Sequence, residues 1–272
     1  MAESRNVWYV YGIVPAEVVF AHAPSGLDDA AVQPVVDAGM AAVTSQLDGT
    51  DYAAERVERG TADMEWLAPR AMAHDRVLTW ASDRGAVVPL PMFSLFSSDA
   101  AVRSMLRSRS EQLRTALARA SEGREYALRV YRLDDELLAV ASQLSPRLAE
   151  LEHAAAAASP GQRYLLERKL ESERKTELRS IAATVAREIV TTLRPIATDT
   201  VEERLVPKPA PGSAENPLVL DAAFLIPAER LESFRRALTS LVERHGSRGF
   251  RFDFTGPWPP YHFVRTQEPS DV

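Results

Sequence analysis

The stretch GFRFDFTGPWPPYHFV, from Gly249 to Val264, joins a strand pattern directly to a proline-rich motif. Its first half alternates phenylalanine with polar residues, which places Phe250, Phe252 and Phe254 on one face of a predicted β-strand. Its second half combines glycine, proline and aromatic residues, which interrupt a regular strand and favour a turn. The stretch therefore predicts the last strand of a sheet, followed by an aromatic tail.

The aromatic tail has two interpretations. In the first it is a structural anchor: glycine permits a turn, the prolines fix an extended path without backbone donors, and Trp258 and Tyr261 fold back as apolar caps. In the second, Trp258, Tyr261 and Phe263 form a rigid aromatic surface that binds a partner. We favour the anchor and keep the interface as the alternative. Both interpretations rest on the same seven residues: Gly256, Pro257, Trp258, Pro259, Pro260, Tyr261 and Phe263.

The residues before this strand predict a β-α-β unit. LVLDAAFLI, from Leu218 to Ile226, is a continuous apolar run typical of a buried strand. A helix is predicted from Pro227 to His245, where Gly246 ends it. Its apolar stripe consists of Leu231, Phe234, Leu238, Leu241 and Val242. A unit this small cannot stand alone, so we expect it to complete a second α+β layer with other strands or with neighbouring helices.

Residues 134–206 carry helix formers, one turn signal at Ser159 to Gln162 and no strand signal, which predicts a helical hairpin. In its second arm, ten of the 18 residues from Arg163 to Ser180 are charged. Two turns between Leu170 and Leu178 lack any large apolar side chain, so we expect them to be exposed. Residues 207–217, rich in proline, predict a linker.

Residues 1–133 predict a ferredoxin-like α+β sandwich. The order strand, strand, helix, strand, helix, strand indicates helices on one face of a mainly antiparallel sheet. The predicted strands are residues 7–13, 38–47, 85–96 and 125–133, and the predicted helices are residues 69–83 and 99–123. We therefore expect two domains: an N-terminal domain of residues 1–133, and a C-terminal domain of residues 134–272 whose last part, 218–272, holds the β-α-β unit and the aromatic tail.

Composition restricts the class of protein. A chain of 272 residues with 46% hydrophobic and 26% charged residues can form a packed core. Cysteine is absent, which excludes disulfides, thiolate catalysis and cysteine metal sites. No signal peptide pattern opens the chain, and no apolar run reaches the about 18 residues of a membrane span. With a net charge of -6, we expect a cytoplasmic protein whose partners are proteins or small molecules, not nucleic acid or membrane.

A search for catalytic, cofactor and metal residues identifies none. No glycine-rich nucleotide loop and no nucleophile elbow is present. The acidic run from Asp134 to Glu136 begins a predicted helix and is explained by the helix dipole. His74 and His245 fall on or beside apolar helix stripes and are interpreted as packing residues. The five histidines lie far apart without metal-ligand spacing: His22, His74, His153, His245 and His262.

Three motifs together resemble the gas vesicle protein F/L family (GvpF and GvpL). They are FTGPWPPYHFV at residues 254–264, WYVYGIV at residues 8–14 and VVPLPMFSLF at residues 87–96. The resemblance spans essentially the whole chain, and TGPWPPY in this position is specific. The chain departs from the family at Pro91 and Phe93, where the pattern has an arginine followed by a small residue. A role for charge in that loop is therefore not transferred.

The resemblance implies a non-enzymatic accessory protein of gas vesicle formation. Such a protein binds the hydrophobic major shell protein or other gas vesicle accessory proteins and stays with the vesicle as a minor component. The alternative is a ferredoxin-like module that binds a small ligand or RNA. Arg103, Arg107 and Arg114 on one predicted helix face favour it. The acidic composition and the lack of an aromatic RNA-binding motif oppose it.

Overall fold

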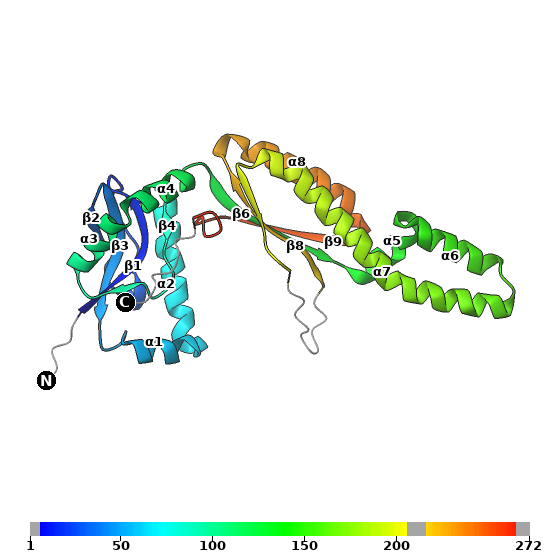
Figure 1. Cartoon of the computed structure of the whole chain (residues 1–272), viewed down its shortest axis with the longest axis horizontal. Coiled ribbons are helices and arrows are strands. Elements are labelled where there is room, and N and C mark those ends of the chain that lie inside the picture. The colour runs from blue at the N-terminus through cyan, green and yellow to red at the C-terminus, as the bar shows by residue number, and fades with distance from the viewer. Residues whose placement is uncertain (1–5, 206–215, 265–272) are drawn as a thin grey trace. The chain divides into compact units, whose positions relative to one another are not determined.

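A computed structural model describes residues 6–205 and 216–264, which divide into two compact units (Figure 1). Unit 1 contains residues 6–125 together with residues 257–264. Unit 2 contains the described residues between 126 and 256. The chain therefore leaves unit 1 after Glu125 and returns to it at Pro257, whereas the sequence predicted one boundary after residue 133.

The sheet of unit 1 is built around its first strand. Its strand order is β2-β3-β1-β4, with β5 also paired to β1, and the pairs of β1 and of β2 are antiparallel. The register of β1 against β3 shifts between Val10 and Gly12, which marks a bulge. The strands are β1 (Asn6–Pro15), β2 (Gln33–Asp37), β3 (Met40–Asp48), β4 (Val88–Pro89) and β5 (Leu95–Phe96).

Helices cover both faces of this sheet. Tyr9 and Tyr11 of β1 pack in one apolar cluster with Val77 and Leu78 of α2. Val10 packs in a separate cluster with side chains of α3 and α4. The expectation that helices cover one face is therefore wrong for unit 1, because near-continuous apolar strands need a helix layer on each side. The helices are α1 (Ala54–Thr61), α2 (Met64–Ser82), α3 (Asp99–Ser108) and α4 (Ser110–Ala120).

Several element boundaries differ from the predictions. α2 begins at Met64 because Asp63 caps it by accepting a hydrogen bond from the backbone N–H of Glu65. Pro69, the predicted helix start, lies inside α2. Ser98 caps α3 by accepting a hydrogen bond from the backbone N–H of Ala101, but the helix expected up to Gly123 is divided at Arg109. The helix α1 and the strand β2 were not predicted, because neither carries a strong apolar period.

Unit 2 has the β-α-β-β-α-β succession of a ferredoxin-like sandwich, with strand order β7-β8-β6-β9. Both sheets thus place their strands in the order second, third, first, fourth. The strand predicted to close the N-terminal domain is β6, the first of unit 2. The expected lack of strands in residues 134–206 is wrong, since β7 lies there. The strands are β6 (Arg124–Arg132), β7 (Asp199–Glu202), β8 (Leu218–Ile226) and β9 (Phe250–Trp258).

The core of unit 2 is an aromatic and aliphatic cluster between its sheet and two helices, α7 and α8 (Figure 1). The ring centroid of Phe234 in α8 lies 5.0 Å from the ring centroid of Phe224 and 5.6 Å from that of Phe254. The predicted stripe of α8 is buried at Phe234, Leu238 and Leu241, but Val242 is exposed. The helices are α5 (Asp134–Leu144), α6 (Pro146–Ala157), α7 (Pro160–Leu193) and α8 (Leu231–His245).

The predicted hairpin consists of α6 packed against α7, with α5 beside them. Leu170 and Leu178 are buried, and no residue between them is, as predicted. Two glutamates of this stretch are nevertheless bound: Glu173 to Arg147 at 2.7 Å and Glu177 to the hydroxyl of Ser145 at 2.8 Å. The predicted linker lies outside the described residues, apart from residues 216–217. Short 3₁₀ turns occur at Leu27–Asp29 (η1), Arg194–Ile196 (η2), Ala228–Arg230 (η3) and Gly246–Arg248 (η4).

Gly249, which directly precedes β9, packs closely against Leu137 of α5, and its substitution tests this contact. Its φ is +85°, and an added Cβ would lie 2.8 Å from Leu137 Cα and overlap the Leu137 backbone nitrogen. We expect Gly249→Ala to lower the free energy of unfolding by about 3 kcal/mol through backbone strain and overpacking. Gly246→Ala is the matched control, because Gly246 has helical φ and only one atom within 4 Å of an added Cβ, at 3.9 Å. Equal urea midpoints for the two variants would contradict this packing.

Candidate interaction site

The aromatic tail leaves the sheet later than predicted. β9 continues through Gly256 to Trp258, and Gly256 keeps a φ of +125° within it. The predicted turn at Gly256 is therefore wrong, although its positive φ agrees with the choice of glycine. The turn follows instead at Pro260, whose carbonyl accepts hydrogen bonds from the backbone N–H of Phe263 at 3.3 Å and of Val264 at 3.2 Å.

The prolines, not the tryptophan, are the buried part of the tail. Pro259, Pro260 and Val264 are buried. Trp258 is 39% exposed and Tyr261 is 38% exposed, so the expectation that their rings are closed apolar caps is wrong. The remaining residues of the predicted site are placed as follows: Gly256 and Pro257 are exposed, and Phe263 is half-buried.

A buried carboxylate holds the tail within unit 1. Glu125 is 2% exposed, and its Oε2 accepts a hydrogen bond of 3.0 Å from the backbone N–H of His262. Its Oε1 lies 2.6 Å from Nδ1 of the same histidine, where the imidazole N–H donates to it. Two contacts to one residue satisfy a carboxylate that would be costly to bury alone. Sequence reasoning missed this pair because the two residues are 137 positions apart.

The tail forms one wall of a groove of about 400 Å³ in unit 1. α2 and the segment after β4 supply the other walls. Two of the three motifs that carry the family resemblance therefore meet here, the one around Pro89 to Met92 and the one around Tyr261. Most of the lining is apolar or aromatic: Ala71, His74, Asp75, Pro89, Leu90, Pro91, Met92, Tyr261 and Val264.

His74 lies at the buried side of this groove. Tyr9 accepts a hydrogen bond of 3.3 Å from the backbone N–H of Phe93, and its hydroxyl lies 2.7 Å from His74 Nδ1. Burial lowers the pKa of His74 to about 4, so the ring is neutral near neutral pH. The Tyr9 hydroxyl then donates to Nδ1, which leaves the proton of the imidazole on Nε2. The interpretation of His74 as a satisfied packing residue is confirmed at Nδ1.

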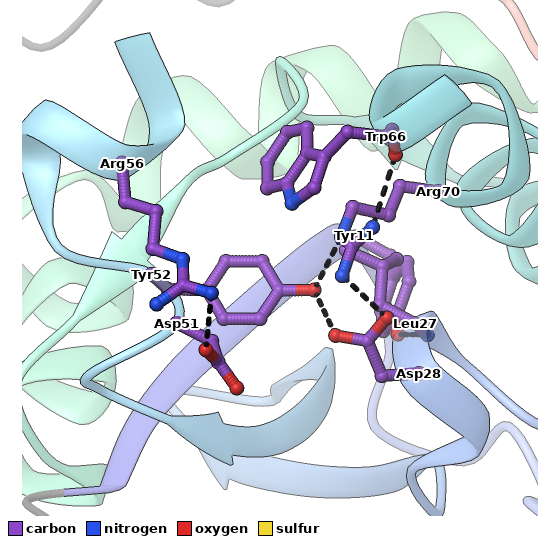
Figure 2. A network of polar contacts seen from close by, with 8 residues as sticks. All are labelled: Tyr11, Leu27, Asp28, Asp51, Tyr52, Arg56, Trp66 and Arg70. Atoms are coloured by element: carbon purple, nitrogen blue, oxygen red, sulfur yellow. Dashed lines mark hydrogen bonds and ion pairs between the residues drawn. The ribbon is translucent and has the colours of Figure 1, made fainter. Parts of the chain in front are cut away.

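A second polar cluster in unit 1 holds the connection between β1 and β2 (Figure 2). Arg70 of α2 binds Asp28 of η1 at 2.8 Å and donates to the hydroxyl of Tyr52 at 3.1 Å. That hydroxyl donates to Asp28 at 2.6 Å, and the guanidinium lies 4.3 Å from the ring centroid of Trp66. Burial raises the pKa of Tyr52, and the Asp28 carboxylate adds to this shift. The groups satisfy one another, which indicates a structural role.

The other histidines do not join the groove. His22 and His153 are exposed, and buried His245 of α8 lies 3.2 Å from Glu188 of α7 in unit 2. Among residues 6–205 and 216–264, no three acidic or histidine side chains are grouped as a metal site would require. Within the same ranges, no helix has the length and apolar character needed to cross a membrane. The absence of a metal or cofactor stays a prediction.

Comparisons with known proteins extend over most of the chain. The family model of the gas vesicle synthesis protein GvpL/GvpF matches residues 7–265. Gas vesicle protein L of Streptomyces sp. (strain CB03234) is 27% identical over 263 residues, which are 96% of this chain and 93% of that protein. GvpF crystal structures from Anabaena sp. PCC7120 and Microcystis aeruginosa have TM-scores of 0.69 and 0.65 at 20% and 18% identity. Each covers 96% of this chain and 99% of the solved chain, which confirms the α+β fold.

The lowered pKa of His74 predicts a pH dependence of stability. The unfolded chain binds a proton at His74 below about pH 6.5, whereas the folded chain binds it only near pH 4, so stability is lost as the pH falls between these values. Between about pH 7 and about pH 4.5, protonation linked to His74 should lower the free energy of unfolding by roughly 2 kcal/mol. His74→Gln keeps an acceptor for Tyr9 but does not titrate. Urea unfolding should therefore show a smaller loss for the variant, and equal losses would contradict the assignment.

Proposed function

This chain belongs to the gas vesicle synthesis protein GvpL/GvpF family, and from this membership we propose that it is a non-enzymatic accessory protein of gas vesicle formation. It binds the hydrophobic major shell protein and other gas vesicle accessory proteins, and it acts in the cytoplasm and on the vesicle. The observation that carries the proposal is the family match over residues 7–265, which includes both units and the aromatic tail.

Exposed apolar side chains of α2 and of the tail, the two segments that line the groove, support a protein partner. Met72 follows the lining residue Ala71 on α2 and is 71% exposed. Trp258 and Tyr261 of the tail are also exposed, and rigid aromatic side chains are frequent hot spots of interfaces. Methionine adapts its shape to different apolar partners. A hydrophobic shell protein offers the kind of surface that such side chains would cover.

The polar groups of unit 1 support a role without catalysis. His74 and Tyr9 combine an imidazole with a hydroxyl, but they are hydrogen bonded to each other and their pKa values are shifted in opposite directions. Burial raises the pKa of Tyr9 and lowers that of His74, so the pair stays neutral. A nucleophile needs a neighbouring base that can accept its proton, and a base with a pKa near 4 is weak.

The alternative of an RNA or small-ligand module loses its main support. Arg103 binds Asp99 at 2.6 Å and also donates to the backbone carbonyl of Val36 in β2. Arg107 lies 3.4 Å from Asp37, and Arg114 donates to the carbonyl of Ala38 at 3.0 Å. The three arginines that suggested a basic face therefore hold the edge strand β2 and the turn after it. Covering an edge strand in this way also limits its pairing with other chains.

Trp258 separates the two interpretations of the tail in a pull-down of the co-expressed major shell protein. Since the indole is 39% exposed, we expect Trp258→Ala to weaken capture by about 2 kcal/mol or more, roughly 30-fold, while the melting midpoint falls by only a few degrees. Tyr164→Ala, which removes an aromatic ring that is 59% exposed on α7, is the matched control and should leave capture unchanged.

Two outcomes would count against these proposals. A large drop in the melting midpoint of the Trp258→Ala chain with normal capture would support the anchor and not the interface. If the unaltered chain captures neither the major shell protein nor any other co-expressed gas vesicle protein, the proposed partners are wrong.

A further inference from the structure

The groove of unit 1 combines apolar walls with a carboxylate that no described residue neutralises. Asp75 of α2 is half-buried and lines the groove beside Tyr261. Among residues 6–205 and 216–264, it has neither an ion pair nor a side-chain hydrogen bond. The pKa of Tyr261 is raised by burial first and then by the negative charges of Asp75 and Glu125. This effect places the Asp75 charge within electrostatic reach of the groove wall.

A neutral donor accompanies this carboxylate. His74 lies one residue before Asp75 on α2 and lines the same groove. Since Tyr9 occupies Nδ1, the free nitrogen of the ring is Nε2, which carries the proton. The groove lining therefore includes two neutral hydrogen-bond donors, the imidazole of His74 and the hydroxyl of Tyr261, and one anion, Asp75, among proline, leucine and methionine side chains. A half-buried carboxylate in apolar surroundings attracts a cation more strongly than one in open water does.

We propose that this groove binds a short apolar segment of a partner protein that carries a lysine or arginine beside its apolar side chains. The apolar side chains fill the space along Leu90, Met92 and Tyr261. A backbone carbonyl of the segment accepts a hydrogen bond from His74 Nε2, and the cation pairs with Asp75. The volume of about 400 Å³ is within the range of ligand pockets. The inference rests on the proposed function for the premise that the ligand is a protein.

Peptide binding to the purified chain tests this inference. The probe is a fluorescein-labelled, end-blocked peptide of about seven residues with two leucines and one arginine in a glycine and serine frame. Its counterpart replaces the arginine by glutamate. We expect the arginine peptide to bind at least about tenfold more tightly in fluorescence anisotropy, because only its charge complements Asp75. Raising the NaCl concentration from about 0.05 M to about 0.5 M should reduce this preference through screening.

Asp75→Asn, which keeps the shape of the side chain but removes its charge, should reduce the preference to about twofold or less. Glu65→Gln is the matched control, because it removes the same charge from an exposed position of the same helix and should leave the preference intact. The inference is overturned if neither peptide binds the unaltered chain, if both bind equally, or if the Asp75→Asn chain keeps the preference. If Asp75→Asn unfolds, the salt dependence of the unaltered chain decides, and a preference that salt does not change overturns it.

These measurements are independent of the pull-down. Peptide preference without capture of any gas vesicle protein would support the groove and refute the proposed partners. Capture without peptide preference would support the partners and refute the groove.

Discussion

The architecture of unit 1 depends on the burial of both faces of β1. Tyr9 and Tyr11 point into one apolar cluster, and Val10 and Ile13 into another, so the sheet needs a helix layer on each side. The tyrosine hydroxyls are satisfied within the core: that of Tyr11 accepts from the backbone N–H of Leu27 at 2.8 Å and donates to Ser45 at 3.0 Å. The Tyr9 hydroxyl bonds to His74 of α2 and to the backbone N–H of Phe93, and because unpaired buried hydroxyls are costly, these two bonds fix the position of α2 and of the segment after β4. The groove is the space that this arrangement leaves at the surface.

The tail completes the groove through a different kind of interaction. Its prolines have no backbone donors to pair, so they can be buried without a sheet partner. The two contacts of the Glu125 carboxylate with His262 then fix the position of the turn. Tyr261 and Val264 line the groove as a result. The sequence motif thus has one structural part, the buried prolines and the histidine, and one surface part, the two exposed aromatic rings.

The sequence predicted the α+β class, most strands and the hairpin, because those elements have strong periodicity. It did not predict β2 or β7, which are short edge strands without a marked apolar period: β2 pairs with β3 directly after it in the chain, and β7 pairs with β8. The predicted helix starts at Pro69, because proline is typical of a first helical turn, whereas α2 starts earlier because of the cap at Asp63, which the prediction did not include. At the site, the sequence identifies the aromatic motif but predicts the wrong buried residues: Trp258 and Tyr261 are exposed, and Pro259 and Pro260 are buried. Burial in the tail depends on Glu125 and α2, and local sequence carries no information about such distant contacts.

The division of the chain has a consequence for how the protein is made. Unit 2 is one uninterrupted stretch, whereas unit 1 is discontinuous and needs residues after 256 to complete it. During synthesis on the ribosome, the sheet of unit 1 emerges before unit 2, but it has no tail to close it until unit 2 and residues 257–264 have been translated. Domains usually mature from the N-terminus onward as they emerge. Here the later unit is the one that can mature first, so the surface of unit 1 is finished only after residues 257–264 have been made, and a fragment cut after residue 125 would lack it.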